Sequence, residues 1–127
     1  MSTVPPIIQA VHGCVVTRLT VDDSFTLSLC GIDREVVLRI DGSGVLRSAD
    51  GEQQIDPDRD PTSAAAMLKL MNRHVDSVRL DDDGGLTLEC GDVSLQLLPS
   101  DHTLSWSMQG PDGTRASCLA EGRVVWE

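Results

Sequence analysis

Apolar and polar residues alternate along most of the chain. Phe25, Leu27 and Leu29, for example, are separated by Thr26 and Ser28, which is the period of a strand with one buried face. Runs rich in Asp, Gly, Ser and Pro interrupt such segments roughly every 8 to 12 residues, as turns do in antiparallel sheets. The pattern predicts short strands near residues 15–21, 25–30, 36–40, 45–46, 76–80, 86–90, 93–97, 104–108, 116–118 and 124–126.

One segment departs from this pattern, because its apolar residues recur at i, i+3, i+4 and i+7. That spacing places them in one stripe along an α-helix. Asp60 is suited to accept hydrogen bonds from the free N–H groups of a first helical turn, and Pro61 fits the position after such a cap. We therefore predict one α-helix at about residues 61–74 that packs on a sheet. Its stripe consists of Ala64, Met67, Leu68 and Met71.

Strands on both sides of a single helix are typical of an α+β domain. We predict a curved antiparallel sheet or split β-barrel of about 8–10 short strands with the helix packed on it. The whole chain, residues 1–127, is short enough for one domain. Pro5 and Pro6 predict an extended lead-in over residues 1–11, and the polar run 47–60 predicts a loop into the helix.

Two stretches of the chain are weakly similar to each other. Residues 16–31 and residues 75–91 each combine a strand, an acidic turn and a second strand that ends in Cys-Gly. The similarity predicts a structural duplication around the helix.

Net charge restricts the classes of partner. The chain carries 20 Asp and Glu against 10 Lys and Arg, a net charge of −10. Nucleic-acid binding requires a cationic track, and the sequence has no Lys/Arg cluster, so we expect no nucleic-acid partner. The same negative field repels an anionic bilayer, so we expect no membrane partner, but it attracts a basic protein at low salt.

Four cysteines lie far apart in the sequence and form no CxxC motif. The N-terminal residues lack the charged and apolar regions of a signal peptide, and no run of about 18 apolar residues occurs. We therefore expect a cytoplasmic protein with reduced, buried thiols. A disulfide, a metal ligand or a reactive thiol are the alternatives for individual cysteines. These residues are Cys14, Cys30, Cys90 and Cys118.

The aspartates before the helix have part of the spacing of a calcium-binding loop. However, Pro61 stands where that loop requires Gly, and Met67 stands where it requires a bidentate Glu. We therefore predict no metal site there and interpret Asp56, Asp58 and Asp60 as a solvated loop with a helix cap.

The sequence contains no catalytic motif. His12, His74 and His102 are isolated, and there is no Gly-rich phosphate loop or nucleophile elbow. We therefore predict no catalytic residue and no cofactor. A histidine that met a cysteine in space would form a nucleophile and base pair, which the sequence alone does not show.

Several strand and turn segments together resemble a known group of proteins. They are residues 16–27, Ile55-Asp56-Pro57, Gly110-Pro111-Asp112-Gly113 and the terminal Val-Trp. In these segments the chain resembles a family of small, acidic, single-domain actinobacterial proteins of unknown function. In size, acidity and lack of catalytic motifs such proteins are similar to the immunity proteins that neutralise polymorphic toxins. The resemblance implies a binding role and no catalytic residues.

These observations favour a non-enzymatic protein-binding domain. Its finer form is an immunity-type inhibitor that docks a basic toxin or another basic partner through acidic loops. The alternatives are a small-molecule-binding or thiol-dependent enzymatic barrel, and a structural subunit that self-associates as a homodimer. The predicted partner-binding residues are Asp56, Asp58, Asp60, Asp81, Asp82 and Asp83.

Overall fold

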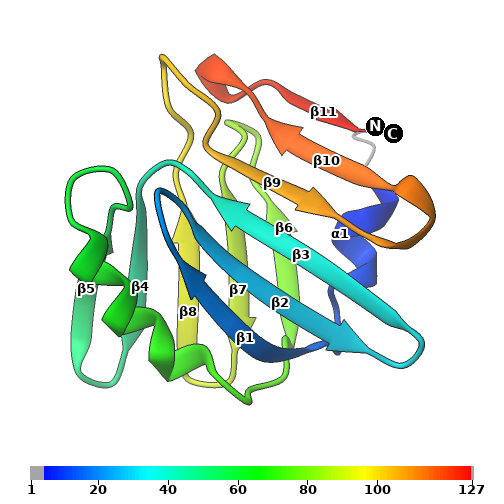
Figure 1. Ribbon diagram of the computed structural model, residues 1–127, viewed down its shortest axis with the longest axis horizontal. Helices are drawn as coiled ribbons and strands as arrows, with labels where there is room; N and C mark the ends of the chain where they lie inside the picture. Colours follow the sequence, from blue (N-terminus) through cyan, green and yellow to red (C-terminus); the bar gives the residue numbers. More distant parts are fainter. Residues whose placement is uncertain (1–4, 127) are drawn as a thin grey trace.

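The computed structural model describes residues 5–126 and places their strands in two antiparallel sheets, one in front of the other in Figure 1. The first sheet has six strands in the order β1-β2-β3-β9-β10-β11. Their bounds are β1 Val15–Val21, β2 Phe25–Gly31, β3 Arg34–Ile40, β9 Trp106–Gln109, β10 Arg115–Cys118 and β11 Val124–Trp126.

The second sheet has five strands in the order β5-β4-β8-β7-β6. Their bounds are β4 Gly44–Ser48, β5 Gly51–Ile55, β6 Ser77–Leu80, β7 Leu86–Cys90 and β8 Val93–Leu97. One apolar cluster fills the space between the sheets, with Phe25, Leu38 and Trp106 from the first sheet and Leu46 and Leu95 from the second. Alternate residues of each strand enter this core because successive side chains point to opposite faces.

The predicted antiparallel strands are confirmed, but the predicted single curved sheet or split barrel is wrong. The chain passes from one sheet to the other at residues 41–43, between β3 and β4, and again at residues 98–105, between β8 and β9. These two connections make a two-layer sandwich out of what the sequence indicated as one meander. Strand β5 lies within the predicted loop 47–60: it is an edge strand whose first four residues are exposed, so it lacks an apolar alternation.

The predicted α-helix is a run of 3-10 turns, η1, which covers Pro61–Leu70. The Asp60 cap is confirmed, because its carboxylate accepts a hydrogen bond from Thr62 N at 3.2 Å. With three residues per turn, the buried side chains recur at i, i+3 and i+6. They are Ala64, Met67 and Leu70; Ala66 is buried as well, whereas Leu68 is 60% exposed.

The predicted extended lead-in is also wrong in part. Pro5 is extended (φ −56°, ψ 136°), but Pro6–Ala10 forms a short helix, α1, that buries Ile7 and Ile8; residues 1–4 lie outside the described part of the chain. Helix α1 contacts β6 and β10, while η1 contacts β5 and β1. Helix α1 and η1 therefore close opposite open sides of the sandwich (Figure 1). Two shorter 3-10 turns, η2 Pro111–Gly113 and η3 Ala120–Gly122, lie between β9 and β10 and between β10 and β11.

The predicted duplication is confirmed in strand order and register. We call residues 6–55 (α1 and β1–β5) the first unit and residues 61–118 (η1 and β6–β10) the second unit. The order β1-β2-β3-β9-β10 in one sheet repeats as β6-β7-β8-β4-β5 in the other. Leu38 pairs with Met108 where Leu95 pairs with Leu46.

The strand register aligns the two units one residue away from the alignment that their shared Cys-Gly suggested. Leu29 pairs with Val36 across the β2–β3 turn, as Cys90 pairs with Val93 across the β7–β8 turn. The structural equivalent of Cys90 is therefore Leu29, not Cys30. Cys90 is buried, whereas Cys30 is half-buried.

Candidate functional site

Acidic residues collect at one end of the sandwich. The turns β1–β2 and β6–β7, the connections β3–β4, β5–η1 and β8–β9, and the segment between β10 and β11 all lie at this end, the upper left in Figure 1. We call it the acidic end, and it contains more than half of the 20 acidic residues. They are Asp22, Asp23, Asp41, Asp56, Asp58, Asp60, Asp81, Asp82, Asp83, Asp101 and Glu121.

The two predicted acidic loops meet the same segment, the β8–β9 connection. Asp56 and Asp58 line a surface hollow of about 470 Å³ together with Ser100 and His102. On the other side, the backbone of Asp83 packs against Gly122, and the neighbouring Glu121 N donates to Ser100 O at 2.7 Å. The structure therefore brings all six predicted residues to one end of the molecule.

Most of these carboxylates also hold their own turns together. The Asp56 carboxylate accepts from Arg59 N at 3.1 Å, and the Asp83 carboxylate accepts from Gly85 N at 2.9 Å. Asp81 forms an ion pair with Arg79 at 3.1 Å. Asp58 and Asp82 are exposed and take part in no ion pair or side-chain hydrogen bond within residues 5–126. These two side chains are the ones that the fold leaves free to meet a partner.

Ion pairs occur at both ends of the sandwich. At the opposite end, Lys69 pairs with Asp50 at 3.1 Å and Arg73 pairs with Asp92 at 2.8 Å, both beside the turns at the bottom of Figure 1. At the acidic end, the ion pairs in the described part of the chain are Arg79–Asp81 and Arg39–Asp41. Because eleven of the 20 acidic residues lie at the acidic end, the negative charge of the protein is concentrated there.

The hollow at the acidic end contains one polar atom without a partner. Asp41 Oδ1 accepts from Arg39 Nε at 3.1 Å, but Asp41 Oδ2 is buried and has no hydrogen-bond partner in the described residues. Buried carboxylate oxygens are normally satisfied. No group of three or more His, Cys, Asp or Glu within residues 5–126 is placed to hold a metal ion.

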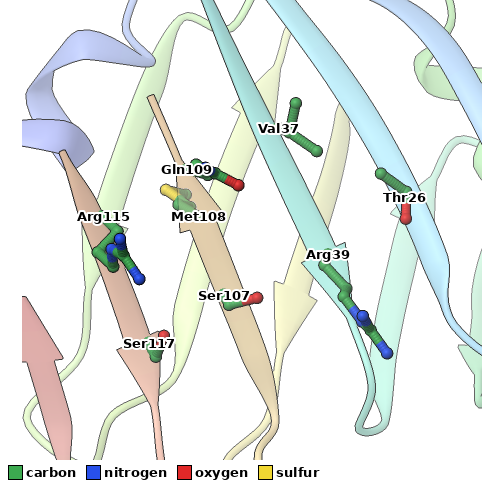
Figure 2. Close-up of a pocket in the computed structure, with 8 residues that line it drawn as sticks. All are labelled: Thr26, Val37, Arg39, Ser107, Met108, Gln109, Arg115 and Ser117. Carbon is green, nitrogen blue, oxygen red and sulfur yellow. The ribbon is translucent and has the colours of Figure 1, made fainter. Parts of the chain in front are cut away.

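A second hollow, of about 300 Å³, lies on the outer face of the six-stranded sheet (Figure 2). Arginines, hydroxyl groups and an amide line it, and Arg39 connects it to the acidic end through Asp41. The sequence did not predict this surface, because its residues come from four strands whose neighbours are known only from the sheet order. The lining residues are Thr26, Val37, Arg39, Ser107, Met108, Gln109, Arg115 and Ser117.

Comparison with known proteins identifies a family. A family model matches residues 7–127, from α1 through both units. The chain belongs to the DUF6188 family, a family of unknown function. No curated protein and no solved structure gave a match.

The thiols of this DUF6188 protein are free and shielded. Cys14, Cys90 and Cys118 are buried, while Cys30 is half-buried, which corrects the expectation that all four are buried. The pKa of the Cys90 thiol is raised to about 11, chiefly by burial and also by nearby Asp76, while Arg73 acts in the opposite direction. Burial also raises the pKa of Cys118. A raised pKa lowers the thiolate fraction and hence nucleophilic reactivity.

The histidines lie apart from these thiols. His12, His74 and His102 are exposed, and within residues 5–126 the side-chain hydrogen bonds of the cysteines involve no histidine. The arrangement gives no support to a thiol nucleophile with a histidine base. In the same residues, no helix is long and apolar enough to span a membrane.

Proposed function

We propose that this protein is a non-enzymatic binding domain that docks a basic protein partner through its acidic end. The observation that carries the proposal is the concentration of carboxylates: eleven of the 20 acidic residues lie at the acidic end, and ion pairs within residues 5–126 engage two of them, Asp41 and Asp81. A one-sided field of this kind steers an oppositely charged partner and raises its association rate.

The hollow at the acidic end offers a place for a basic side chain. Its walls contain Asp41, Asp56 and Asp58, and Asp41 Oδ2 is the buried oxygen that lacks a partner. A guanidinium from the partner would face three carboxylates there, and charge-assisted hydrogen bonds between arginine and carboxylate are among the strong ones in proteins. Asp82, exposed on the neighbouring turn, extends the docking surface beyond the hollow.

The finer form of the proposal is an immunity-type inhibitor. A toxin that acts on nucleic acid needs a cationic surface for the phosphates. An acidic end such as this one is complementary to that surface, and its docking would block access of the substrate. The small size and the −10 net charge of the chain support this form.

Paired variants test the docking surface. Asp58→Asn/Asp82→Asn removes two charges from the acidic end without touching a turn contact, while Glu52→Gln/Glu89→Gln removes two charges from the outer face of the other sheet. In pull-downs from the native lysate at low and high salt, we expect wild type and the second variant to capture one basic protein that elutes with salt. The first variant should capture it weakly, with an association rate lowered roughly tenfold.

Equal capture by both variants would rule out the acidic end as the docking surface. Capture of the protein itself alone would favour the second candidate, a homodimer. That candidate has one specific observation in its favour: the edge strand β11 exposes Val125 (43%) and Trp126 (42%), and exposed apolar edges pair readily with other chains. Light scattering of the purified protein distinguishes a monomer from this dimer.

A further inference from the structure

The outer face of the six-stranded sheet carries two neighbouring rows of side chains across β2, β3, β9 and β10. In the first row, Thr26 pairs with Arg39, Arg39 with Ser107, and Ser107 with Ser117. Directly opposite residues on one face of a sheet have their Cβ atoms about 5 Å apart. The row therefore places Arg39 between Thr26 and Ser107, with Ser117 beyond, and all four residues line the second hollow (Figure 2).

The second row runs beside the first. Ser28 pairs with Val37, Val37 with Gln109, and Gln109 with Arg115. Neither row contains a carboxylate, in a chain with twice as many acids as bases. We call the two rows together the arginine face.

The equivalent rows of the five-stranded sheet are different in charge. In place of the second row, Glu89 pairs with Ser94, Ser94 with Arg47, and Arg47 with Glu52. Arg47 forms an ion pair with Glu52 at 3.4 Å. The duplication therefore provides the same backbone twice, once with two rows that contain no carboxylate and once with a row that contains two, Glu52 and Glu89.

We propose that the arginine face binds a phosphate-bearing small molecule. Arginine presents a planar fork of donors that matches a phosphate group, and the hydroxyls of Ser107 and Ser117 are further donors in the same row. The hollow of about 300 Å³ suits a small ligand rather than a chain. The adjoining acidic end repels a polyanion such as RNA or an acidic protein.

Arg39 is held in place for this role. Its Nε donates to Asp41 Oδ1 at 3.1 Å, and the side chain remains 56% exposed beside the hollow. The ion pair fixes the guanidinium at the rim, and its terminal nitrogens are additional donors for a phosphate oxygen. This hollow differs from that of the proposed function, and the Arg39–Asp41 ion pair joins the two. Phosphate binding and protein capture are measured separately, so each proposal can fail without the other.

A titration with inorganic phosphate tests the proposal. Nuclear magnetic resonance of ¹⁵N-labelled protein, at constant ionic strength and near neutral pH, should show saturable shifts of the amide signals of Thr26, Ser107 and Ser117. Arg39→Gln should raise the dissociation constant about tenfold. The control is Arg47→Gln, which removes the same charge from the outer face of the other sheet, in the row equivalent to the second one, and should leave phosphate binding unchanged.

Two further variants keep the test independent of the Arg39–Asp41 ion pair. Arg39→Lys retains the charge without the fork and should bind phosphate with intermediate affinity, and Ser107→Ala should weaken binding without disturbing any ion pair. Shifts that never saturate, equal losses in Arg39→Gln and Arg47→Gln, or equal responses to acetate and phosphate would overturn the proposal. So would tighter binding of an RNA oligonucleotide or an acidic peptide to the same residues.

Discussion

The two units of the sandwich share a fold but not a surface. Phe25 pairs with Ile40 in the first unit as Leu86 pairs with Leu97 in the second, so the positions that face the core are apolar in both. At the outer positions, Arg39 in the first unit corresponds to Gln96 in the second. Burial constrains the inner residues of a duplicated sheet, whereas solvent leaves the outer ones free to diverge.

The core itself is not symmetric. Gly44 and Trp106 occupy equivalent positions at the starts of β4 and β9, because each pairs with the last residue of the other unit's third strand: Gly44 with Leu97 of β8, and Trp106 with Ile40 of β3. A Cβ on Gly44 would lie 2.8 Å from Gln96 O, whereas Trp106 is fully buried. One of the two equivalent positions therefore has the largest side chain of the core, and the other has none.

Among the substitutions considered, loss of the Trp106 side chain should have the largest effect on stability. Trp106→Ala should lower the free energy of unfolding by about 3–5 kcal/mol, because it leaves a cavity and removes the donor that Nε1 gives to Gly84 O at 3.0 Å. Urea denaturation measures the change. Trp106→Phe, which keeps most of the volume, should cost less than half as much, and equal losses in the two variants would show that packing is not the dominant contribution.

The two helical segments offer a second comparison, because α1 is an α-helix and η1 is a run of 3-10 turns. In η1, Leu70→Ala should destabilise the protein by about 2–4 kcal/mol, since Leu70 is buried. Leu68→Ala should change the stability by about 0.5 kcal/mol or less, since Leu68 is exposed. An α-helix with the stripe expected from the sequence would reverse this order, so urea denaturation of the two variants distinguishes the geometries.

The smallest expected effect is on the pH dependence of stability and involves Cys90, whose structural equivalent in the first unit is Leu29. The unfolded chain loses the Cys90 proton near its ordinary pKa of 9.0, but the folded protein keeps that proton up to a pKa of about 11. The free energy of unfolding should therefore fall as pH rises from about 9 to about 11, by about 1–2 kcal/mol. Cys90→Val should flatten this dependence in denaturation series at increasing pH. Parallel slopes for wild type and variant would contradict the assignment to Cys90.

Local sequence patterns were sufficient to locate most strands, the start of η1 and the acidic loops. Alternation located ten of the eleven strands, because a half-buried strand needs an apolar residue at every second position. Asp60 and Pro61 marked the start of η1, because capping depends on residues that are adjacent in the chain. The acidic loops were also predicted, because turn-forming and acidic residues occur there at consecutive positions of the chain.

The arrangement of these elements in space could not be predicted from the sequence, because it depends on tertiary contacts. The division into two sheets, the 3-10 geometry of η1 and the edge strand β5 all depend on contacts between distant segments. The same holds for both surfaces proposed for binding. Asp58 and Asp82 reach one end, and Arg39 and Ser107 reach one row, because antiparallel strand pairing brings together residues that are far apart in the chain.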